Sequence, residues 1–173
     1  MMRQTSHALP LDAETKAVER PVDHKCELKL WLRLLTCRNL IEAEIRRRLQ
    51  AEFAVTLPRF DLLAQLDKVP GGLTLGETSR RMMVSNANVT TLAERLVADG
   101  LIARRIDPRD RRTSYISLTP RGRGSFAAMA RAHQQWIAEL FGDLDRRDIG
   151  GLMQLLDKTK RSVSRATAGG VER

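Results

Sequence analysis

Small amide and hydroxyl side chains gather in a segment that has the pattern of a short helix, residues 85–99. Its apolar residues recur at three- and four-residue spacing and share one face that can pack inward: Val89, Leu92, Ala93 and Leu96. The polar residues fall elsewhere on the helix: Ser85, Asn86, Asn88, Thr90, Thr91 and Arg95. Amides, hydroxyls and a guanidinium are suited to hydrogen bonding with base edges in a major groove. We therefore predict that this helix reads duplex DNA.

A β-hairpin with an arginine-rich tip is predicted directly after this helix. Two runs with alternating apolar residues, 102–106 and 115–118, are joined by Asp-Pro-Arg-Asp-Arg-Arg. A cationic β-ribbon can reach an adjacent minor groove or a phosphate. The contact residues predicted at this tip are Arg109, Asp110, Arg111 and Arg112. Helix and hairpin together predict a mainly α fold with a small β-wing, a winged helix-turn-helix that binds double-stranded DNA.

The charge of the chain agrees with a nucleic-acid partner. The formal net charge is +9 and the isoelectric point is about 10.5, and a basic balance of this size attracts polyanions. No apolar stretch approaches the roughly 20 residues that span a bilayer. The first twenty residues also lack the apolar centre of a signal peptide. We therefore expect a cytoplasmic protein without membrane contact.

Catalytic and metal-binding motifs are missing from the sequence. The three histidines, His7, His24 and His133, are scattered, and there is no HExxH, GxSxG or glycine-rich phosphate loop. The two cysteines, Cys26 and Cys37, do not have the spacing of a metal motif. We expect no enzyme activity, no catalytic residues, no metal and no cofactor.

Periodicity and turn signals divide the chain into five parts. We expect a flexible N-terminal arm (1–22), an N-terminal dimerisation helix (23–57), the winged domain (58–118), C-terminal dimerisation helices (119–164) and a disordered tail (165–173). Helix N-caps are predicted at Thr74, Ser85, Thr119 and Asp145, and a left-handed Gly100 is predicted to end the DNA-reading helix.

Both ends of the chain are predicted to be long amphipathic helices, which a monomer rarely needs and a homodimer uses. The inward side of the first helix is marked by Leu28, Trp31, Leu32, Leu35, Ile41, Ile45 and Leu49. Two-fold symmetry would place two DNA-reading helices about 34–36 Å apart over a palindromic site.

The stretch 73–122 resembles the MarR (multiple antibiotic resistance regulator) family of bacterial transcriptional regulators. The matching segments are 73–82, 84–86, 96–102, 107–112 and 118–122. The resemblance covers about residues 25–164. It implies a homodimer joined through its terminal helices, with two winged lobes. Most relatives repress genes near their own and leave DNA when a small molecule binds.

The resemblance also assigns roles at the DNA. It implies that Arg112 enters the minor groove and that Asp110 holds the wing arginines by a salt bridge. The polar residues of the 85–99 helix would lie in the major groove, with Arg95 on a phosphate or a guanine edge.

The effector pocket of the resembling family lies between the winged lobe and the dimerisation helices. Candidate ligand-binding residues are therefore Trp31, Arg33, Arg38, Asn39 and His133. A guanidinium beside a tryptophan could hold an aromatic acid by charge and stacking. The alternative is that Trp31 is core and that the arginines pair with acidic residues of the partner chain.

Two further segments, 56–66 and 82–92, resemble a branch of the family that controls catabolism of aromatic acids such as hydroxycinnamates. The resemblance implies an effector that is a small aromatic acid or its coenzyme A thioester.

Two alternatives use the same fold. Cys26 and Cys37 lie on the first helix, as in relatives that sense peroxides, but the single tyrosine, Tyr115, lies on a wing strand, so the tyrosine partners of those relatives are missing. A nonspecific architectural DNA-binding protein is the second alternative. It would bind operator and random DNA almost equally, whereas a regulator should discriminate by about 10³-fold or more.

Overall fold

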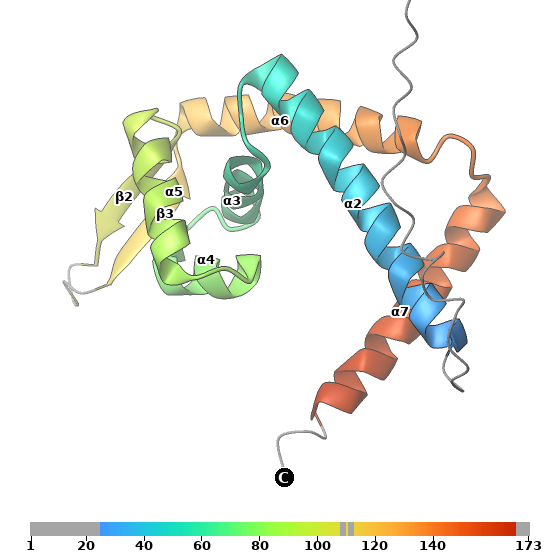
Figure 1. Ribbon diagram of the computed structural model, residues 1–173. Coiled ribbons are helices and arrows are strands. Elements are labelled where there is room, and N and C mark those ends of the chain that lie inside the picture. The colour runs from blue at the N-terminus through green and yellow to red at the C-terminus, as the bar shows by residue number, and fades with distance from the viewer. Residues whose placement is uncertain (1–24, 108–109, 111–112, 169–173) are drawn as a thin grey trace, which may run out of the picture. The chain divides into compact units, whose positions relative to one another are not determined.

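The computed structural model describes residues 25–107, 110 and 113–168. Helices and strands follow one another along the chain as shown in Figure 1: α2 (Lys25–Phe53), α3 (Leu57–Asp67), β1 (Leu73–Thr74), α4 (Leu75–Met82), α5 (Asn86–Ala98), β2 (Ile102–Ile106), β3 (Ser114–Leu118), α6 (Pro120–Leu140) and α7 (Arg146–Ala168). The predicted fold class, mainly α with a small β-wing, is confirmed.

A three-stranded antiparallel sheet forms the wing and its base. The strand order is β1-β3-β2, with Ile102 opposite Leu118 and Leu73 opposite Ile116. The two predicted hairpin strands are present, although the second begins one residue earlier, at Ser114. Sequence reasoning missed β1, because two residues are too short to show alternation.

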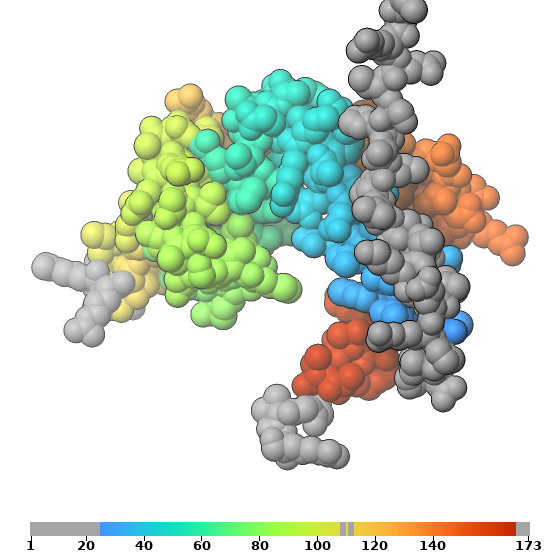
Figure 2. All heavy atoms as spheres, in the orientation of Figure 1, coloured from blue at the N-terminus to red at the C-terminus, as the bar shows by residue number. Residues whose placement is uncertain are grey.

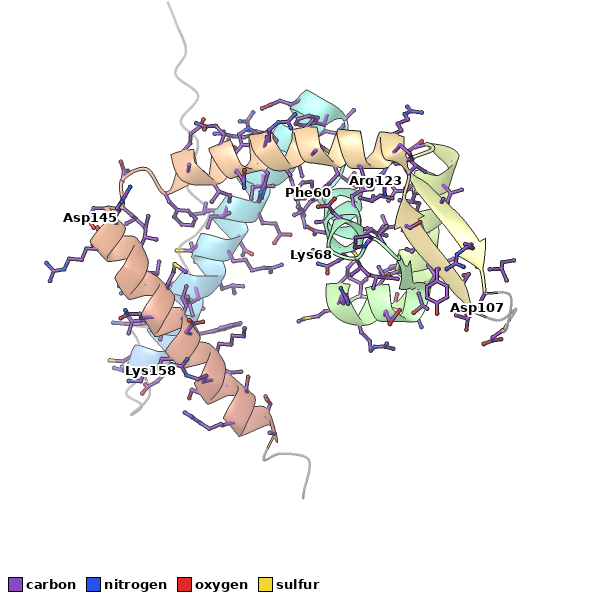
Figure 3. The ribbon with its side chains drawn as sticks, turned by 180° about the vertical axis from the view of Figure 1, so that it is seen from behind. Phe60, Lys68, Asp107, Arg123, Asp145 and Lys158 are labelled. Atoms are coloured by element: carbon purple, nitrogen blue, oxygen red, sulfur yellow. The ribbon has the colours of Figure 1, made fainter. Side chains whose placement is uncertain are left out.

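The chain divides into two compact units whose boundary lies inside α6, between residues 130 and 131. The first unit is therefore larger than the predicted 58–118 domain and includes α2 and the first half of α6. One reason is the contact between Phe60 of α3 and Phe126 of α6, whose ring centroids are 5.6 Å apart; Figure 3 labels Phe60 beside α6. The fully buried residues of this unit come from five helices and the sheet: Leu49, Leu62, Leu63, Leu66, Thr78, Val89, Leu96, Ile102, Ile116 and Met129.

The start of α6 lies against the connection between α5 and β2. The Thr119 hydroxyl donates to the carbonyl of Gly100 at 2.8 Å and accepts the N–H of Gly122 at 2.9 Å, so the predicted N-cap is confirmed. A Cβ added to Gly122 would lie 1.9 Å from the Leu101 carbonyl oxygen. The chain therefore needs glycine here, because α6 approaches this backbone closely.

The other predicted caps are also present. Ser85 accepts the N–H of Asn88 at 3.3 Å, and Asp145 Oδ1 accepts the N–H of Asp148 at 2.8 Å. Gly100 is left-handed, with φ of 69°, as predicted. The helix itself ends two residues earlier, at Ala98, with Asp99 as its C-cap.

Thr74 and Glu77 form a reciprocal capping box at the start of α4. The Glu77 carboxylate accepts the N–H of Thr74 at 2.8 Å and its hydroxyl at 2.7 Å, and the Glu77 N–H donates to the Thr74 hydroxyl at 3.2 Å. The backbone N–H of Thr74, followed by its hydroxyl, lowers the pKa of Glu77 below the ordinary 4.5. The ionised carboxylate is thus favoured in the folded state.

We expect the capping box to make stability depend on pH in a defined direction. Because the folded-state pKa of Glu77 is lowered, its contribution is complete above 4.5 and is lost as the pH falls through the folded-state value. Wild type should therefore be more stable than Glu77→Gln near neutral pH, and the difference should disappear in acid. Urea unfolding of both proteins, from neutral pH into acid, measures this difference in stability. A difference that stayed constant with pH would contradict the expectation.

The predicted inward side of α2 is only partly buried within one chain, and the prediction for the C-terminal tail is wrong in part. In α2 only Ile45 and Leu49 of the predicted inward side are buried, whereas Trp31 is 58% exposed and Leu28 is 49% exposed. Periodicity identifies a face but does not say what covers it. The predicted disordered tail is wrong for residues 165–168, because α7 continues to Ala168, where the Thr167 hydroxyl donates to the Val163 carbonyl at 3.1 Å. Residues 169–173 and the predicted arm, 1–22, lie outside the described residues.

None of the helices in the described ranges combines the length and apolar character needed to cross a membrane.

Candidate DNA interface

Helix α5 has one buried face and one exposed polar face. Val89 and Leu96 are fully buried and Ala93 is 5% exposed. The exposed polar residues are Ser85, Asn86, Asn88, Thr91 and Arg95, and Thr90 is half-buried. Figure 2 shows the atoms of α4 and α5, in green, forming a continuous surface on the near side of the first unit. The predicted division of this helix into apolar and polar faces is therefore confirmed.

The threonines of α5 present their hydroxyl groups in a restricted way. The Thr90 hydroxyl donates to the Asn86 carbonyl at 2.9 Å, and the Thr91 hydroxyl donates to the Ala87 carbonyl at 3.2 Å. A hydroxyl has one proton, so both oxygens can only accept from a further partner while these bonds last. They match the exocyclic amines of adenine and cytosine in a major groove. The asparagine amides can both donate and accept.

Helix α4 and α5 are joined by a tight turn. The Met83 N–H donates to the Arg80 carbonyl at 3.3 Å, and the Val84 N–H donates to the Ser79 carbonyl at 3.2 Å. These two bonds are the Schellman pattern that ends a helix. The Ser79 hydroxyl adds a bond to the Val84 carbonyl at 2.6 Å. The turn therefore fixes the angle at which α5 leaves α4.

Arginines also lie at the base of the wing. On β2, Ala103, Arg104, Arg105 and Ile106 are all exposed. Arg104 Nε donates to the Ser114 hydroxyl at 3.1 Å, and the Arg105 guanidinium lies 5.5 Å from the centre of the Tyr115 ring. These contacts hold two cations on the outer strand of the hairpin, close in sequence to α5.

The tip of the wing is closed by backbone and side-chain bonds. The Asp107 N–H donates to the Thr113 carbonyl, and the Thr113 N–H donates to the Asp110 carbonyl, both at 2.9 Å. The Asp110 carboxylate accepts the Thr113 hydroxyl at 2.8 Å. Figure 3 labels Asp107 at the outer end of the hairpin. The predicted contacts Arg109, Arg111 and Arg112 lie outside the described residues, so the salt bridge from Asp110 to the wing arginines stays a prediction.

The sequence-based set of contact residues left out several exposed side chains. Arg104 and Arg105 were not in it, although both stand in the hairpin just before its arginine-rich tip. At the end of α4, Arg80, Arg81 and Met83 are also exposed. Met83 follows α4 directly and stands two residues before Ser85, the N-cap of α5. This position in the turn was the signal in the sequence that its side chain could be exposed beside the DNA-reading helix.

The ligand-binding candidates are spread over two units. Trp31 and Arg33 are two residues apart on α2, so they point to different sides of it. The Arg38 guanidinium lies 2.8 Å from the Glu42 carboxylate. His133 belongs to the second unit, where its ring meets Trp136 edge-on at 6.5 Å and burial lowers its pKa.

Two of these candidates, Arg38 and Asn39, do share a shallow hollow along α2. Glu42, Ala43 and Arg46 line the same hollow, and Arg46 also pairs with Glu42. Both cysteines, Cys26 and Cys37, are exposed free thiols on α2. Across the described ranges, no group of three or more histidine, cysteine or acidic residues is arranged to hold a metal ion.

An ion pair between Arg59 of α3 and Asp99 ties down the C-terminal end of α5. The Arg59 side chain is only 20% exposed, and its Nε is buried without a hydrogen-bond partner in the described structure. The carboxylate of Asp99 is about half exposed. Removing it would therefore leave a largely buried cation with less compensation.

We expect Asp99→Asn to lower the free energy of unfolding by about 1 kcal/mol, because the pair is partly screened by solvent. A double-mutant cycle with Arg59→Met should give a coupling energy of about 0.5–1 kcal/mol, measured by urea unfolding. Asp67→Asn, at the exposed end of α3, is the control and should change little. Strictly additive single effects would show that the pair contributes nothing.

Comparison with known proteins covers this region and the helices around it. A sequence model of the MarR family matches residues 55–113. The chain is 31% identical over 154 residues to the transcriptional activatory protein BadR of Rhodopseudomonas palustris. The aligned region covers 84% of this chain and 87% of BadR.

Solved structures resemble the same parts of the chain. A MarR family transcriptional regulator from Silicibacter pomeroyi matches with a TM-score of 0.70 and 28% identity, over 83% of this chain and 99% of that one. A mutant MarR from E. coli complexed with operator DNA matches with a TM-score of 0.69 and 20% identity, over 80% of this chain and 99% of that one. At 20% identity, the likeness to the mutant MarR from E. coli shows a shared fold.

Proposed function

Because the chain belongs to the MarR family of transcriptional regulators, we propose that it is a homodimeric, sequence-specific regulator that binds a palindromic operator. The observation that carries this proposal is the division of α5, with Val89 and Leu96 fully buried and Asn86, Asn88 and Arg95 exposed. A helix held this firmly by its apolar face can present its polar face to base edges.

In the proposed complex, α5 lies in the major groove. Ser85 is at its N-terminal end, where the positive helix dipole favours phosphate. Asn86, Asn88, Thr90 and Thr91 face base edges, with the threonine oxygens as acceptors, and Arg95 contacts a phosphate or a guanine edge. The wing reaches the adjacent minor groove with Arg112, supported by Arg109, Asp110 and Arg111. Arg104 and Arg105 add phosphate contacts at its base.

The exposed apolar residues at both ends of the chain support the homodimer. On α2 they are Leu28, Leu30, Trp31 and Leu40; on α7 they are Ile149, Leu152, Met153, Leu155, Leu156 and Val163. Exposed apolar patches of this kind mark surfaces for association. Light scattering after size-exclusion chromatography should give twice the 19.5 kDa mass of the chain. A monomer at all concentrations would overturn this part of the proposal.

We propose repression that is relieved by a small aromatic acid or its coenzyme A thioester. Trp31, Arg33, Arg38, Asn39 and His133 remain the proposed ligand residues, and the hollow beside Arg38 and Asn39 is the support for two of them. Any such effector must bind the DNA-incompetent state more tightly, with a coupling of about 1–3 kcal/mol. Isothermal titration with a panel of aromatic acids and thioesters tests the idea, and no heat from any of them would remove it.

Activation is the second candidate for the direction of control, and the relative BadR, a transcriptional activatory protein, favours it. A reporter placed behind the bound promoter separates the two: deletion of the regulator raises expression under repression and lowers it under activation.

Thiol sensing is the alternative to a small-molecule effector, and the exposure of Cys26 and Cys37 supports it. Peroxide treatment that leaves operator binding unchanged would dispose of it.

The central test is discrimination between DNA sequences. A duplex selected from random-sequence pools should bind about 10³-fold or more tightly than random DNA, measured by fluorescence anisotropy. Arg112→Ala should cost roughly 1–3 kcal/mol of specific binding and reduce the dependence of affinity on salt. Equal affinity for selected and random DNA would instead support the architectural alternative.

A further inference from the structure

Met83, in the turn between α4 and α5, has an unusual backbone for its residue type. Its φ is 56° and ψ is 39°, which is the left-handed region. In the Schellman pattern this position is commonly glycine, because a Cβ is strained there. The other non-glycine residue with positive φ in the described chain, Ala54, carries only a methyl group. Methionine is therefore a costly choice at this turn.

Packing within the chain does not offset that strain. Met83 is 92% exposed, the highest exposure among the large apolar residues of the described structure. A strained residue that persists without internal compensation is a reason to look for a function. Glycine or asparagine would form the same turn with less strain, so the feature that methionine adds is its long apolar side chain.

The surroundings of Met83 indicate what that side chain meets. Arg80 and Arg81, in the last turn of α4, are exposed on one side of it, and Ser85 and Asn86, at the start of α5, are exposed on the other. In helix-turn-helix proteins the first helix crosses the DNA backbone and the start of the second helix contacts base edges. The turn between them therefore lies at the edge of the major groove.

We propose that Met83 is a specificity-determining residue whose side chain packs on a thymine C5-methyl group at the edge of the major groove. The inference rests on the proposed DNA-binding function of α5. The thymine methyl is the apolar group that base edges display in this groove. Methionine suits it, because its unbranched and polarisable side chain adapts to an irregular apolar surface.

Three substitutions separate this role from a structural one. Met83→Gly and Met83→Asn relieve the left-handed strain but remove the apolar side chain, whereas Met83→Leu keeps an apolar side chain and the strain. We expect the glycine and asparagine variants to melt no lower than wild type yet to bind the selected operator about four-fold more weakly, the factor for one buried methyl group. The leucine variant should bind almost as wild type does. A Met83→Gly protein that binds as tightly as wild type would overturn the proposal.

Replacing each operator thymine in turn by deoxyuridine removes only the methyl group. The affinity of wild type should fall about four-fold when one particular thymine of a half-site is replaced, whereas the affinity of Met83→Gly should not change at that thymine. Equal losses in both proteins, or no loss in wild type, would refute the contact. Wild-type discrimination against random duplexes is measured in the same assay. Its absence would overturn the proposed function and this inference together, whereas normal discrimination without a Met83 effect would overturn this inference alone.

Discussion

Gly122→Ala is expected to lower the free energy of unfolding by about 3 kcal/mol. The new Cβ would lie 1.9 Å from the Leu101 carbonyl oxygen and 2.8 Å from its carbon, and both are backbone atoms that cannot rotate away. Relief would need α6 to move from the α5–β2 connection, which would break the Thr119 bonds to Gly100 and Leu101. Urea unfolding monitored by circular dichroism measures the loss.

Gly124→Ala is the matched control for this prediction. Gly124 lies two residues further along α6, and a Cβ there would meet no atom within 4 Å. Alanine should therefore stabilise the helix by roughly 0.5–1 kcal/mol. Opposite signs for the two substitutions would identify close approach, rather than helix propensity, as the reason for Gly122. If both variants were stabilised, the packing of α6 described above would be wrong.

The double variant Asn88→Ala/Thr91→Ala is expected to reduce discrimination between operator and random DNA by about 100-fold. Each base contact contributes roughly 1–3 kcal/mol to discrimination. Both side chains are exposed, so their loss should leave the melting temperature almost unchanged. Nonspecific affinity, which comes from phosphate contacts, should also persist. Anisotropy titrations with selected and random duplexes give both affinities.

Arg95→Gln is the control for this variant. It removes a proposed phosphate or guanine contact rather than an amide or hydroxyl. If Arg95 contacts phosphate, affinity for all duplexes should fall about equally and the salt slope should decrease. An unchanged operator-to-random ratio in the Asn88→Ala/Thr91→Ala protein would show that α5 does not read bases.

Local patterns predicted the elements that carry the interface. Period-3.6 spacing located α5, because Val89, Ala93 and Leu96 are set by contacts within a few turns of chain. The caps at Thr74 and Ser85 followed for the same reason, since a short polar side chain bonds an N–H three residues later. These features need no knowledge of the rest of the fold.

Contacts between distant segments could not be predicted in this way. Strand β1 exists because Leu73 pairs with Ile116, far along the chain. Gly122 belongs to a family motif, yet the reason for it is the approach of α6 to Leu101. The exposure of Trp31 and Met83 is equally non-local, because a face or a turn in the sequence does not reveal what covers it. The candidate site was therefore predicted for α5 and the wing tip, and missed at the α4–α5 turn and on β2.

Because β2 lies at one edge of the sheet, its outer backbone is open to another strand. Its end carries Ile106, which is 61% exposed, directly after Arg104 and Arg105. Charged side chains on such an edge discourage edge-to-edge aggregation. The two arginines are thus expected to protect solubility, in addition to the phosphate contacts proposed for them. Alanine at both positions is expected to promote fibrous self-association. The loss of free protein could then be mistaken for weaker DNA binding. Lysine at both positions keeps the charge and should keep the protein in solution.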